Sequence, residues 1–316
     1  MPEKKLISIC IPAYKRAGFL KRLLDSILDQ DCNDFEVIVT DDSPGNEIEI
    51  LCLQFEKKIP LTYRKNASTL GTPENWNESV RHARGEWIKL MHDDDWFAGP
   101  GSLSSFSDAI KINPDASFIF SAYKNVYLDE ERVKDVFLPA FRFKQLSIDP
   151  ASLFSSNVIG PPSVTIYKKR EDTGFDKNLK WLVDIDFYIR YLKNSKPVYI
   201  NKPLVNVGIG SQQVTMDCFR QRKIEIPEGF YLLNRTGQGV LKNIMVYDAW
   251  WRLLRNLEIK NTDEIIESGY SGPLPEVIRS MVRAQKKLPG FLLKTGITSK
   301  TFMFMHYIFN RKRIKD

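Results

Sequence analysis

Residues 6–43 read LISICIPAYKRAGFLKRLLDSILDQDCNDFEVIVTDDS, and this stretch decides the fold class. Residues 6–11 form a continuous apolar run, which predicts a strand that is buried on both faces and stops at Pro12. Apolar residues then recur every three or four positions from Leu20 to Leu28, as on one face of a helix. Residues 35–39 predict the next strand. A strand, a helix and a strand of this length predict a right-handed βαβ unit, and hence an α/β protein with a mostly parallel sheet flanked by helices.

The alternation of strands and helices continues along the chain. Residues 61–63 predict a short third strand, and residues 72–74 predict the start of a helix with proline at its first position. Gly85 ends that helix, and the apolar residues of EWIKLM (86–91) predict a fourth strand. Ligands bind beyond the carboxyl ends of the strands in such sheets. The loops 12–18, 40–45, 64–71 and 92–99 are therefore expected to form the site.

The chain divides into an α/β domain over residues 1–215 and a helical extension over residues 216–316. Helical spacing of apolar residues appears in 240–257, 275–288 and 291–309, and Pro289 and Gly290 separate the last two segments. The extension is expected to serve an acceptor, a protein partner or a membrane.

Three consecutive carboxylates, Asp93, Asp94 and Asp95, follow the fourth strand. Adjacent like charges repel by about 1 kcal/mol per pair near a surface, so this turn is expected to have a counter-charge. Mg²⁺ or Mn²⁺ suits such oxygen ligands and also binds substrate phosphates. The sequence contains no GxGxxG and no GxxxxGK[ST] motif, so a metal would have to hold a diphosphate. The alternative is a solvated acidic turn that caps the following helix.

Positive charge is concentrated near the C-terminal end. Of the 46 Lys and Arg, ten lie from Arg279 onward, against one of the 39 Asp and Glu, which leaves 36 basic and 38 acidic residues before that point. A nucleic-acid-binding protein would spread its basic face over the folded domain, so no nucleic-acid partner is predicted. The four cysteines lack metal-binding spacing, and no apolar run reaches the roughly 18 residues of a membrane span. We therefore expect a cytoplasmic protein, neither secreted nor integral to a membrane.

The same basic segment contains the apolar run TFMFMHYIF (301–309). This run is too short to cross a bilayer but suits the interface of an anionic membrane, where each cation adds about 1 kcal/mol of binding. The protein is thus expected to be peripheral on the cytoplasmic face of a membrane. In the alternative, Phe302, Met305 and Phe309 dock this helix on the enzyme and its cations face water.

Several of these stretches resemble a known family. Residues 7–43, Asn66, Gly71 and Asn75, and ARGEWIKLMHDDDWF (83–97) resemble the family-two inverting nucleotide-sugar glycosyltransferases with the GT-A fold, which is Rossmann-like. This likeness covers about the first hundred residues closely. A weaker likeness to the acceptor half of those enzymes follows in GPPSVTIYKKR (160–170) and TGFDKNLKWLVDIDFYIRYLK (173–193).

The resemblance implies a set of donor-binding residues in the strand-end loops. They are Pro12, Tyr14, Arg16, Asp42, Asn66, Asn75 and Asp93. The first three would flank the nucleobase and the first phosphate of a UDP- or dTDP-sugar, and Asp42 would accept a hydrogen bond from the base. The polar loop 208–213 is a candidate lid over the donor.

The resemblance also implies a metal site. Asp93 would lie near the ribose, Asp94 would coordinate Mg²⁺ or Mn²⁺, and Asp95 would lie next to it. The family motif is usually Asp, any residue, Asp, whereas His92 stands in the first place here. Whether His92 contacts the metal is left open.

A second acidic cluster lies in WLVDIDFYIRYL (181–192). Inverting transfer needs a carboxylate that takes the proton of the acceptor hydroxyl. The resemblance matches Asp184 to this base, with Val183 where a Glu is usual, and Asp186 is the alternative base. Both acids also suit the first turn of a helix, where the helix dipole favours negative charge.

The sequence therefore predicts a metal-dependent inverting glycosyltransferase. It would move a sugar from a nucleotide-diphosphate sugar to a hydroxyl of a glycan or lipid-linked saccharide, as in cell-surface polysaccharide synthesis. One alternative is a sugar nucleotidyltransferase, although PAYKRAG (12–18) is a poor match to the glycine-rich loop expected of that class. The other is a non-catalytic binding protein that retains the fold, in which His92 and Val183 would mark lost activity.

Overall fold

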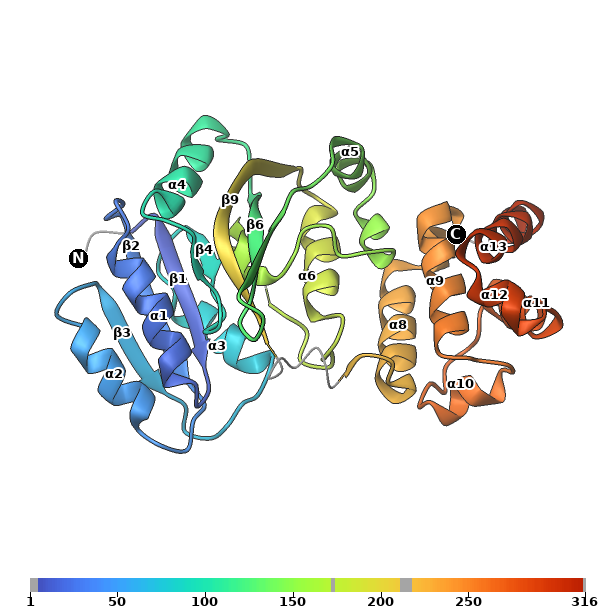
Figure 1. Cartoon of the computed structure of the whole chain (residues 1–316), viewed down its shortest axis with the longest axis horizontal. Coiled ribbons are helices and arrows are strands. Elements are labelled where there is room, and N and C mark those ends of the chain that lie inside the picture. The colour runs from blue at the N-terminus through green and yellow to red at the C-terminus, as the bar shows by residue number, and fades with distance from the viewer. Residues whose placement is uncertain (1–4, 172–173, 211–217, 315–316) are drawn as a thin grey trace. The chain divides into compact units, whose positions relative to one another are not determined.

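The computed structural model describes residues 5–171, 174–210 and 218–314 of the chain. The chain divides into two compact units. The first unit comprises Met1–Ser147, Val158–Asn178 and Asp186–Ser211, and the second comprises Ile148–Asn157, Leu179–Ile185 and Gln212–Asp316. The first unit holds the sheet, and the second is helical (Figure 1).

The first unit is built on a mixed sheet, which among the described residues has nine strands in the order β3-β2-β1-β4-β8-β6-β9-β5, with β7 paired to β6. The strands are β1 (Ile7–Ala13), β2 (Phe35–Asp41), β3 (Leu61–Lys65), β4 (Trp87–Leu90), β5 (Trp96–Phe97), β6 (Phe118–Tyr127), β7 (Arg132–Val136), β8 (Thr165–Lys168) and β9 (Pro197–Ile209). Strands β1 to β4 pair in parallel, as do β6 and β9, and the other pairs are antiparallel. The predicted α/β class is confirmed.

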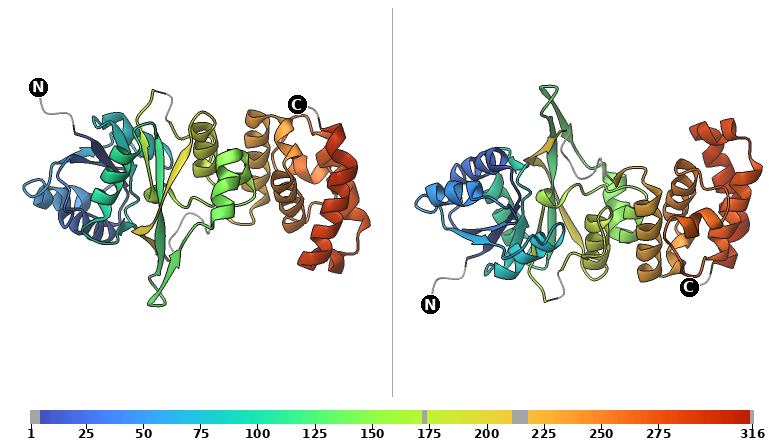
Figure 2. Two further views of the ribbon diagram at one scale, coloured as in Figure 1. Left: turned by 90° about the horizontal axis from the view of Figure 1, so that it is seen from above. Right: turned by 90° about the horizontal axis from the view of Figure 1, so that it is seen from below.

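Helices and 3-10 turns surround this sheet. They are α1 (Ala17–Leu28), α2 (Glu47–Phe55), α3 (Glu74–His82), α4 (Ser102–Ile112), α5 (Ala140–Ile148), η2 (Pro162–Val164) and α6 (Val183–Leu192). Helix α1 contacts β5 and α2. It buries Leu20, Leu23, Leu24 and Ile27, as its apolar spacing predicts, whereas Leu28 is exposed. The hairpin of β6 and β7 extends away from the rest of the sheet in both views of Figure 2.

Strand β1 continues through Pro12 to Ala13, so the predicted strand end at Pro12 is wrong. Alternate residues of β1 face β4, as the bond from the Met91 N–H to the Cys10 carbonyl shows. Pairing with β4 ends at Cys10. The backbone of Pro12 also faces the β4 side of β1, but beyond the last residue paired with β4. Its missing N–H therefore interrupts no hydrogen bond of the sheet. On the other side of β1, Pro12 lies opposite Thr40 of β2.

The turn that carries the three aspartates joins β4 to β5. Strand β4 lies beside β1 in the middle of the sheet, whereas β5 is the last strand of the order and pairs with β9. A short turn can join strands so distant in the order because the sheet curls. This arrangement brings the acidic turn next to both the end of β1 and the end of β9. Gly208, in the candidate lid loop, belongs to β9, and residues 211–213 of that loop lie outside the described residues.

The second unit packs helices around an aromatic core. Its elements are η1 (Pro150–Phe154), α8 (Arg222–Thr236), η3 (Gln238–Lys242), α9 (Ile244–Asn256), α10 (Asp263–Glu267), α11 (Glu276–Lys287), α12 (Gly290–Lys294), α13 (Gly296–Asn310) and η4 (Arg311–Arg313). Helix α9 lies between α8 and the pair α11 and α13 (Figure 1). Its Trp250 and Trp251 are fully buried in the core.

Two helix predictions for this unit need correction, and two helices, α8 and α10, were not predicted. Helix α8 was not predicted, because Pro227 and Gly229 disfavour a helix, but burial of its apolar residues outweighs that cost. The predicted helix 240–257 is a 3-10 turn followed by α9, which begins after the N-cap Asn243. The predicted helix 291–309 is broken at Thr295, whose backbone is extended, into α12 and α13.

Candidate functional site

Arg16 is the counter-charge of the acidic turn in the structure. Its guanidinium binds both carboxylate oxygens of Asp93, with Nε 3.3 Å from Oδ2 and Nη2 on Oδ1, and its Nη1 lies 3.0 Å from Oδ2 of Asp94. Burial raises the pKa of Asp93 to about 7, although the charge of Arg16 opposes this. Asp93 and Asp95 are each 2 % exposed, so the interpretation of a solvated turn is wrong for them. The Asp94 side chain is more accessible, at 14 %.

His92, Asp94 and Asp95 lie close enough to share a metal ion. One ligand atom from each lies within 4.8 Å of the others. Opposite ligands of one Mg²⁺ ion lie about 4.2 Å apart, so a shift of a few tenths of an ångström in these side chains would bring all three onto one ion. Burial lowers the pKa of His92 to about 4, so its neutral ring has a lone pair at pH 7. Its Nδ1 lies 4.0 Å from Oδ2 of Asp95, and its Nε2 is buried without a hydrogen-bond partner among the described residues. The three residues therefore fit a divalent cation, and His92 belongs to the candidate ligand set.

Ser163 and Lys89 support the turn from within the first unit. The Ser163 hydroxyl oxygen accepts the backbone N–H of His92 at 2.9 Å, and the same hydroxyl bonds the carboxylate of Asp95. The ammonium of Lys89, fully buried in β4, donates to the Ser163 carbonyl and lies 4.9 Å from the ring centre of Phe106. Burial lowers the pKa of Lys89 to about 7, against the charge of Asp95.

Strand β9 closes the other side of the turn. The backbone N–H of Gly208 donates to Oδ1 of Asp95 at 3.1 Å. A Cβ atom at position 208 would lie 2.5 Å from the carbonyl oxygen of Asp94, so this approach requires glycine. Arg22 also donates to that carbonyl, at 2.9 Å, and its guanidinium lies 3.6 Å from the ring centre of Trp96. The turn is thus held in one conformation by backbone contacts as well as by ion pairs.

Asp42, the predicted contact for the nucleobase, accepts hydrogen bonds from the loop 66–71. Its carboxylate accepts the Asn66 amide at 2.6 Å, the Leu70 N–H at 3.0 and 3.1 Å, and the Gly71 N–H at 2.7 Å. A carboxylate has about four lone-pair sites. In this conformation a nucleobase would have to replace one of these loop contacts, and the role of Asp42 in binding the base stays a prediction.

Asn75 and Tyr14 both lie at the carboxyl ends of the parallel strands, but Asn75 is buried and Tyr14 is exposed. Asn75 is 5 % exposed, and its amide donates to the carbonyls of Ala13 at 3.3 Å and Thr40 at 3.2 Å while its oxygen accepts from Asn66 at 2.9 Å. It therefore ties the ends of β1 and β2 together and positions their loops. Tyr14 is 46 % exposed just beyond β1, where its ring can face a ligand. Pro12, within β1, is partly exposed.

The two candidate bases have different surroundings. Asp184, partly exposed in the first turn of α6, accepts from the Asn157 amide at 2.7 Å and the Ile185 N–H at 2.8 Å. Burial raises its pKa to about 6, although these hydrogen bonds lower it. Asp186 is fully buried and pairs with the guanidinium of Arg190 at 2.8 Å. The surroundings favour Asp184 as a proton acceptor.

Sequence reasoning missed several positioning residues. Asn157 is 27 residues from Asp184, and no motif links them. Lys89 was given no role in the sequence analysis. A single lysine within an apolar run does not indicate that its side chain is buried next to the acidic turn. Ser163 lies in the stretch 160–170, whose resemblance to the acceptor half was a usable signal.

The comparisons with known proteins agree with this geometry. Residues 8–170, about half of the chain, match the family described as glycosyl transferase family 2. The chain belongs to this family, and it is an enzyme of glycosyl transfer.

Two relatives show the range of similarity in sequence. An uncharacterized glycosyltransferase of Haemophilus influenzae is 26% identical over 209 residues, which are 63% of this chain and 67% of the relative. The abequosyltransferase RfbV of Salmonella typhimurium is 35% identical over 97 residues, which are 29% of each chain. The chain spans about two thirds of the length of the first curated relatives it matches.

Solved structures share the architecture. TarS 1-349 of S. aureus in complex with UDP-GlcNAc has a TM-score of 0.64 at 17% identity, over 97% of this chain and 90% of that chain. The mannosyltransferase PcManGT from Pyrobaculum calidifontis in complex with GDP-Man and Mn²⁺ has a TM-score of 0.57 at 13% identity, over 100% and 89%. These likenesses show the fold, and the predicted GT-A fold is confirmed.

Proposed function

We propose that this enzyme is a metal-dependent inverting glycosyltransferase that uses a nucleotide-diphosphate sugar. The observation that supports this most directly is the group of His92, Asp94 and Asp95 beside Arg16, at the carboxyl ends of β1 and β4, in a chain of glycosyl transferase family 2. Carboxylates and a guanidinium at this edge of the sheet suit a cation and a diphosphate, respectively.

The donor would bind at this edge through the predicted residues. Tyr14 would face the nucleobase of a UDP- or dTDP-sugar, and Asp93 would lie near the ribose. Arg16 can exchange part of its bonding with Asp93 and Asp94 for a phosphate, because a guanidinium has five donors. Two structural neighbours were solved with UDP-GlcNAc and with GDP-Man, which supports a nucleotide sugar in general.

A cation would be held by His92, Asp94 and Asp95. Because one ligand is an imidazole nitrogen, Mn²⁺ suits the set better than Mg²⁺, which prefers oxygen. When bound, the cation would neutralise the developing charge of the leaving diphosphate. Ser163, Lys89 and Gly208 would keep the ligands in place.

Asp184 would act as the general base. Its carboxylate would take the proton of an acceptor hydroxyl while the hydroxyl oxygen forms a bond to the anomeric carbon. The bond from that carbon to the diphosphate oxygen breaks at the same time, and the nucleoside diphosphate leaves with the electron pair. A base with a pKa of about 6 is mostly ionised at pH 7, and Asn157 holds the carboxylate in orientation.

The acceptor would be a glycan or lipid-linked saccharide, used in cell-surface polysaccharide synthesis at the cytoplasmic face of a membrane. No helix in the part of the chain that the structure describes is long and apolar enough to cross a bilayer. Nine of the ten predicted tail cations are described, and all are exposed. Ile297, Phe304 and Phe309 on α13 are 80, 51 and 76 % exposed, which suits the interface of an anionic membrane.

The predicted docking alternative for the tail helix is only partly supported. Phe302 packs on the core of the second unit, together with the buried Met303. Met305 and Phe309 are 42 and 76 % exposed, so they do not dock the helix. Helix α13 therefore docks through one face and leaves an apolar, cation-flanked face for the proposed membrane contact.

The test is a panel of nucleotide sugars assayed for release of nucleoside diphosphate with Mn²⁺, with Mg²⁺ and with a chelator. We expect one UDP- or dTDP-sugar to be hydrolysed slowly, with Mn²⁺ the better cation and no turnover in the chelator. Equal turnover of that sugar with and without a cation would refute the metal assignment. Pyrophosphate release from a nucleoside triphosphate and a sugar phosphate would instead indicate a nucleotidyltransferase.

A further inference from the structure

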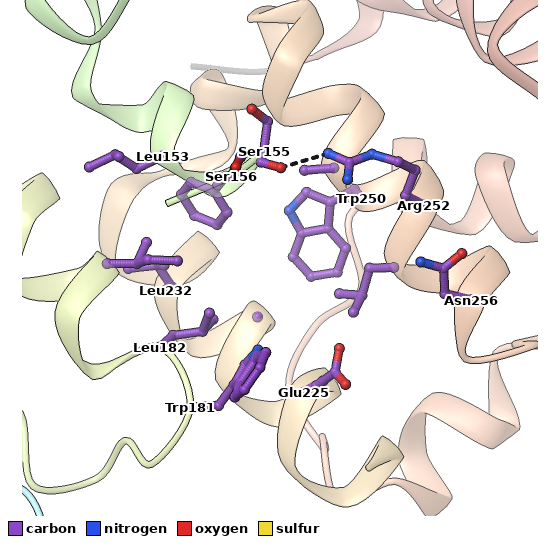
Figure 3. Close-up of a pocket in the computed structure, with 15 residues that line it drawn as sticks. Leu153, Ser155, Ser156, Trp181, Leu182, Glu225, Leu232, Trp250, Arg252 and Asn256 are labelled. Atoms are coloured by element: carbon purple, nitrogen blue, oxygen red, sulfur yellow. Dashed lines mark hydrogen bonds between the residues drawn. The ribbon is translucent and has the colours of Figure 1, made fainter. Parts of the chain in front are cut away.

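The second unit contains a pocket that the proposed function does not use. The pocket has a volume of about 260 Å³ and lies wholly within this unit (Figure 3). Its walls come from three stretches far apart in the sequence: residues 153–156, residues 181–185 at and just before the start of α6, and helices α8 and α9. Its volume is just below the roughly 300–1,000 Å³ typical of sites for drug-sized ligands. The pocket therefore suits a ligand of about one sugar ring.

Two buried hydrogen-bonding groups of the pocket residues lack partners. The indole Nε1 of Trp250 and the hydroxyl of Ser155 are buried without a hydrogen-bond partner among the described residues. Trp250 is 1 % exposed, and Figure 3 shows its indole in the middle of the pocket, below Ser155 and Ser156 and above Trp181. Buried N–H and O–H groups rarely stay unpaired in proteins. Oxygen atoms of a ligand in the pocket could pair with these groups.

The remaining walls combine apolar rings with a few polar groups. Phe154 and Trp181 add aromatic surface, and leucines from η1, α8 and α9 add aliphatic surface. Arg252 is fixed by Asp248 at 2.9 Å and by the Ser155 carbonyl at 2.8 Å. A lipid chain would leave the N–H and the hydroxyl unpaired. A nucleotide phosphate would face the Glu225 carboxylate, and Arg252, the cation in the lining, is already paired with Asp248. A neutral ring with apolar C–H faces and several hydroxyls matches both kinds of wall.

The segment just before α6, which forms one wall of the pocket, is fixed by hydrogen bonds. The carboxylate of Glu228, on α8, accepts three consecutive backbone N–H groups, those of Lys180, Trp181 and Leu182, at 2.8, 2.9 and 2.8 Å. These contacts hold Trp181 in place before α6 begins. A preformed site loses less conformational entropy when it binds a small ligand.

We propose that this pocket is a binding subsite for one saccharide unit of the acceptor. Trp181, Leu182 and Ile185 line it, and the proposed base Asp184 belongs to the same helical turn but not to the lining. The sugar bound here would therefore be a unit other than the one that receives the transferred sugar. This assignment rests on the proposed function for its biological meaning, but the binding itself needs neither donor nor metal.

The experiment measures binding of methyl glycosides of glucose, galactose, mannose, rhamnose and N-acetylglucosamine to the full chain by ligand-observed NMR, without nucleotide or metal. We expect at least one glycoside to bind in the millimolar range. Trp250→Phe, which keeps most of the ring but removes the N–H, and Ser155→Ala should each weaken that binding about three- to tenfold.

Trp251→Phe is the matched control. Trp251 is equally buried in α9, but its indole N–H donates to the Ser299 hydroxyl at 3.2 Å and it does not line the pocket. Its substitution should leave glycoside binding unchanged. Ser155→Ala removes only a hydroxyl, so it keeps the test valid if Trp250→Phe fails to fold.

Geraniol, a short isoprenoid alcohol, is tested in the same assay as a probe for a lipid ligand. Three outcomes would overturn the proposal: no glycoside binds, the two pocket variants bind glycosides as the wild type does, or geraniol binds in the pocket in place of a glycoside. Failure of the proposed function is distinguishable from these outcomes. A protein that binds glycosides in this pocket but releases no nucleoside diphosphate from any donor would refute the transferase mechanism and leave the subsite standing.

Discussion

The two units differ in how many charged side chains they bury. Among the described residues, the charged side chains buried in the first unit are Glu36, Asp41, Asp42, Lys89, Asp93, Asp95 and Asp186, whereas the second unit buries only Glu228. Both units bury aromatic rings, but the second unit keeps its described tail cations at the surface. Burying a charge is costly unless it is paired and hydrogen-bonded, and such groups are concentrated at functional sites.

This difference indicates a division of tasks. In the first unit, Arg16 is already paired with Asp93 and Asp94, and Lys89 is buried nearby. Such a group suits the proposed charged donor. The second unit has a mostly apolar pocket, whose charged lining residues are Glu225 and Arg252, and a basic tail. The pocket suits a neutral sugar, and the tail suits an anionic membrane. Asp184, partly exposed and with a raised pKa, is the group of the second unit to which we assign the role of base. Substitutions can test each part of this comparison.

The largest effect is expected for Asp184→Asn. General base catalysis contributes about 10²- to 10⁴-fold, so kcat should fall by that factor while nucleotide affinity stays almost unchanged. In the wild type, kcat should fall below pH about 6, because the base acts only when it is deprotonated. Steady-state kinetics over a pH series and nucleotide titration check both points.

Asp186→Asn is the control for that variant. Because Asp186 is buried and pairs with Arg190, its substitution should lower thermal stability, with any loss of kcat following the loss of folded protein. A normal rate in Asp184→Asn, together with a stable but inactive Asp186→Asn, would transfer the role of base to Asp186.

The next largest effect is expected for Asp94→Asn. It removes a charged ligand and keeps the shape of the side chain, so donor affinity and turnover should fall together, by about 100-fold in kcat/KM. Asp95→Asn should have a smaller effect on turnover, because the Asp95 carboxylate is buried and already bound by Gly208 and Ser163, whereas that of Asp94 is more accessible to a cation. Calorimetric titration of Mn²⁺ and of the nucleotide separates the two losses. Metal-independent nucleotide binding at wild-type strength in Asp94→Asn would show that the cation binds elsewhere.

A smaller effect, on stability, is expected for Glu228→Gln. The substitution replaces the charged acceptor of three backbone N–H groups. It should lower the free energy of unfolding by about 1.5–3 kcal/mol, the range for hydrogen bonds to charged groups. Denaturant unfolding measures this value. Glu267→Gln, at an exposed position of α10, is the control and should unfold as the wild type does. Equal stability of the two variants would mean that the segment before α6 does not depend on the carboxylate.

The sequence predicted the first unit better than the second for a physical reason. The strand-end acids Asp42 and Asp93 to Asp95 follow apolar runs directly, so the position of each in the fold follows from local pattern. The role of Asp42 was harder to foresee, because its partners at Asn66 to Gly71 depend on how a loop folds back.

The second unit is assembled from distant segments, and local pattern does not reveal such assembly. The pocket needs residues 153–156, 181–185 and 225–256 to meet, and α8 contains a proline and a glycine that local propensity counts against. In α13, helical spacing allowed the alternative in which Phe302, Met305 and Phe309 dock the helix on the enzyme. The face that packs is set by the core around Trp251, whose indole N–H contacts Ser299, so the buried positions are Ser299, Met303 and Asn310.

The smallest effect is expected at the proposed membrane face. Sedimentation with phosphatidylglycerol vesicles at low salt should capture the wild-type protein and release it at high salt, because the cations of the tail are screened. Ile297→Ser removes an apolar side chain that is 80 % exposed and should weaken capture by roughly fivefold to tenfold, the worth of about 1–1.4 kcal/mol of interfacial burial. Ile112→Ser, at a 76 % exposed position of α4 in the first unit, is the matched control and should change nothing. If the wild type does not sediment at low salt, the exposed apolar face of α13 has to be assigned to a protein partner, and the contrast between the units would then lie only in their sites.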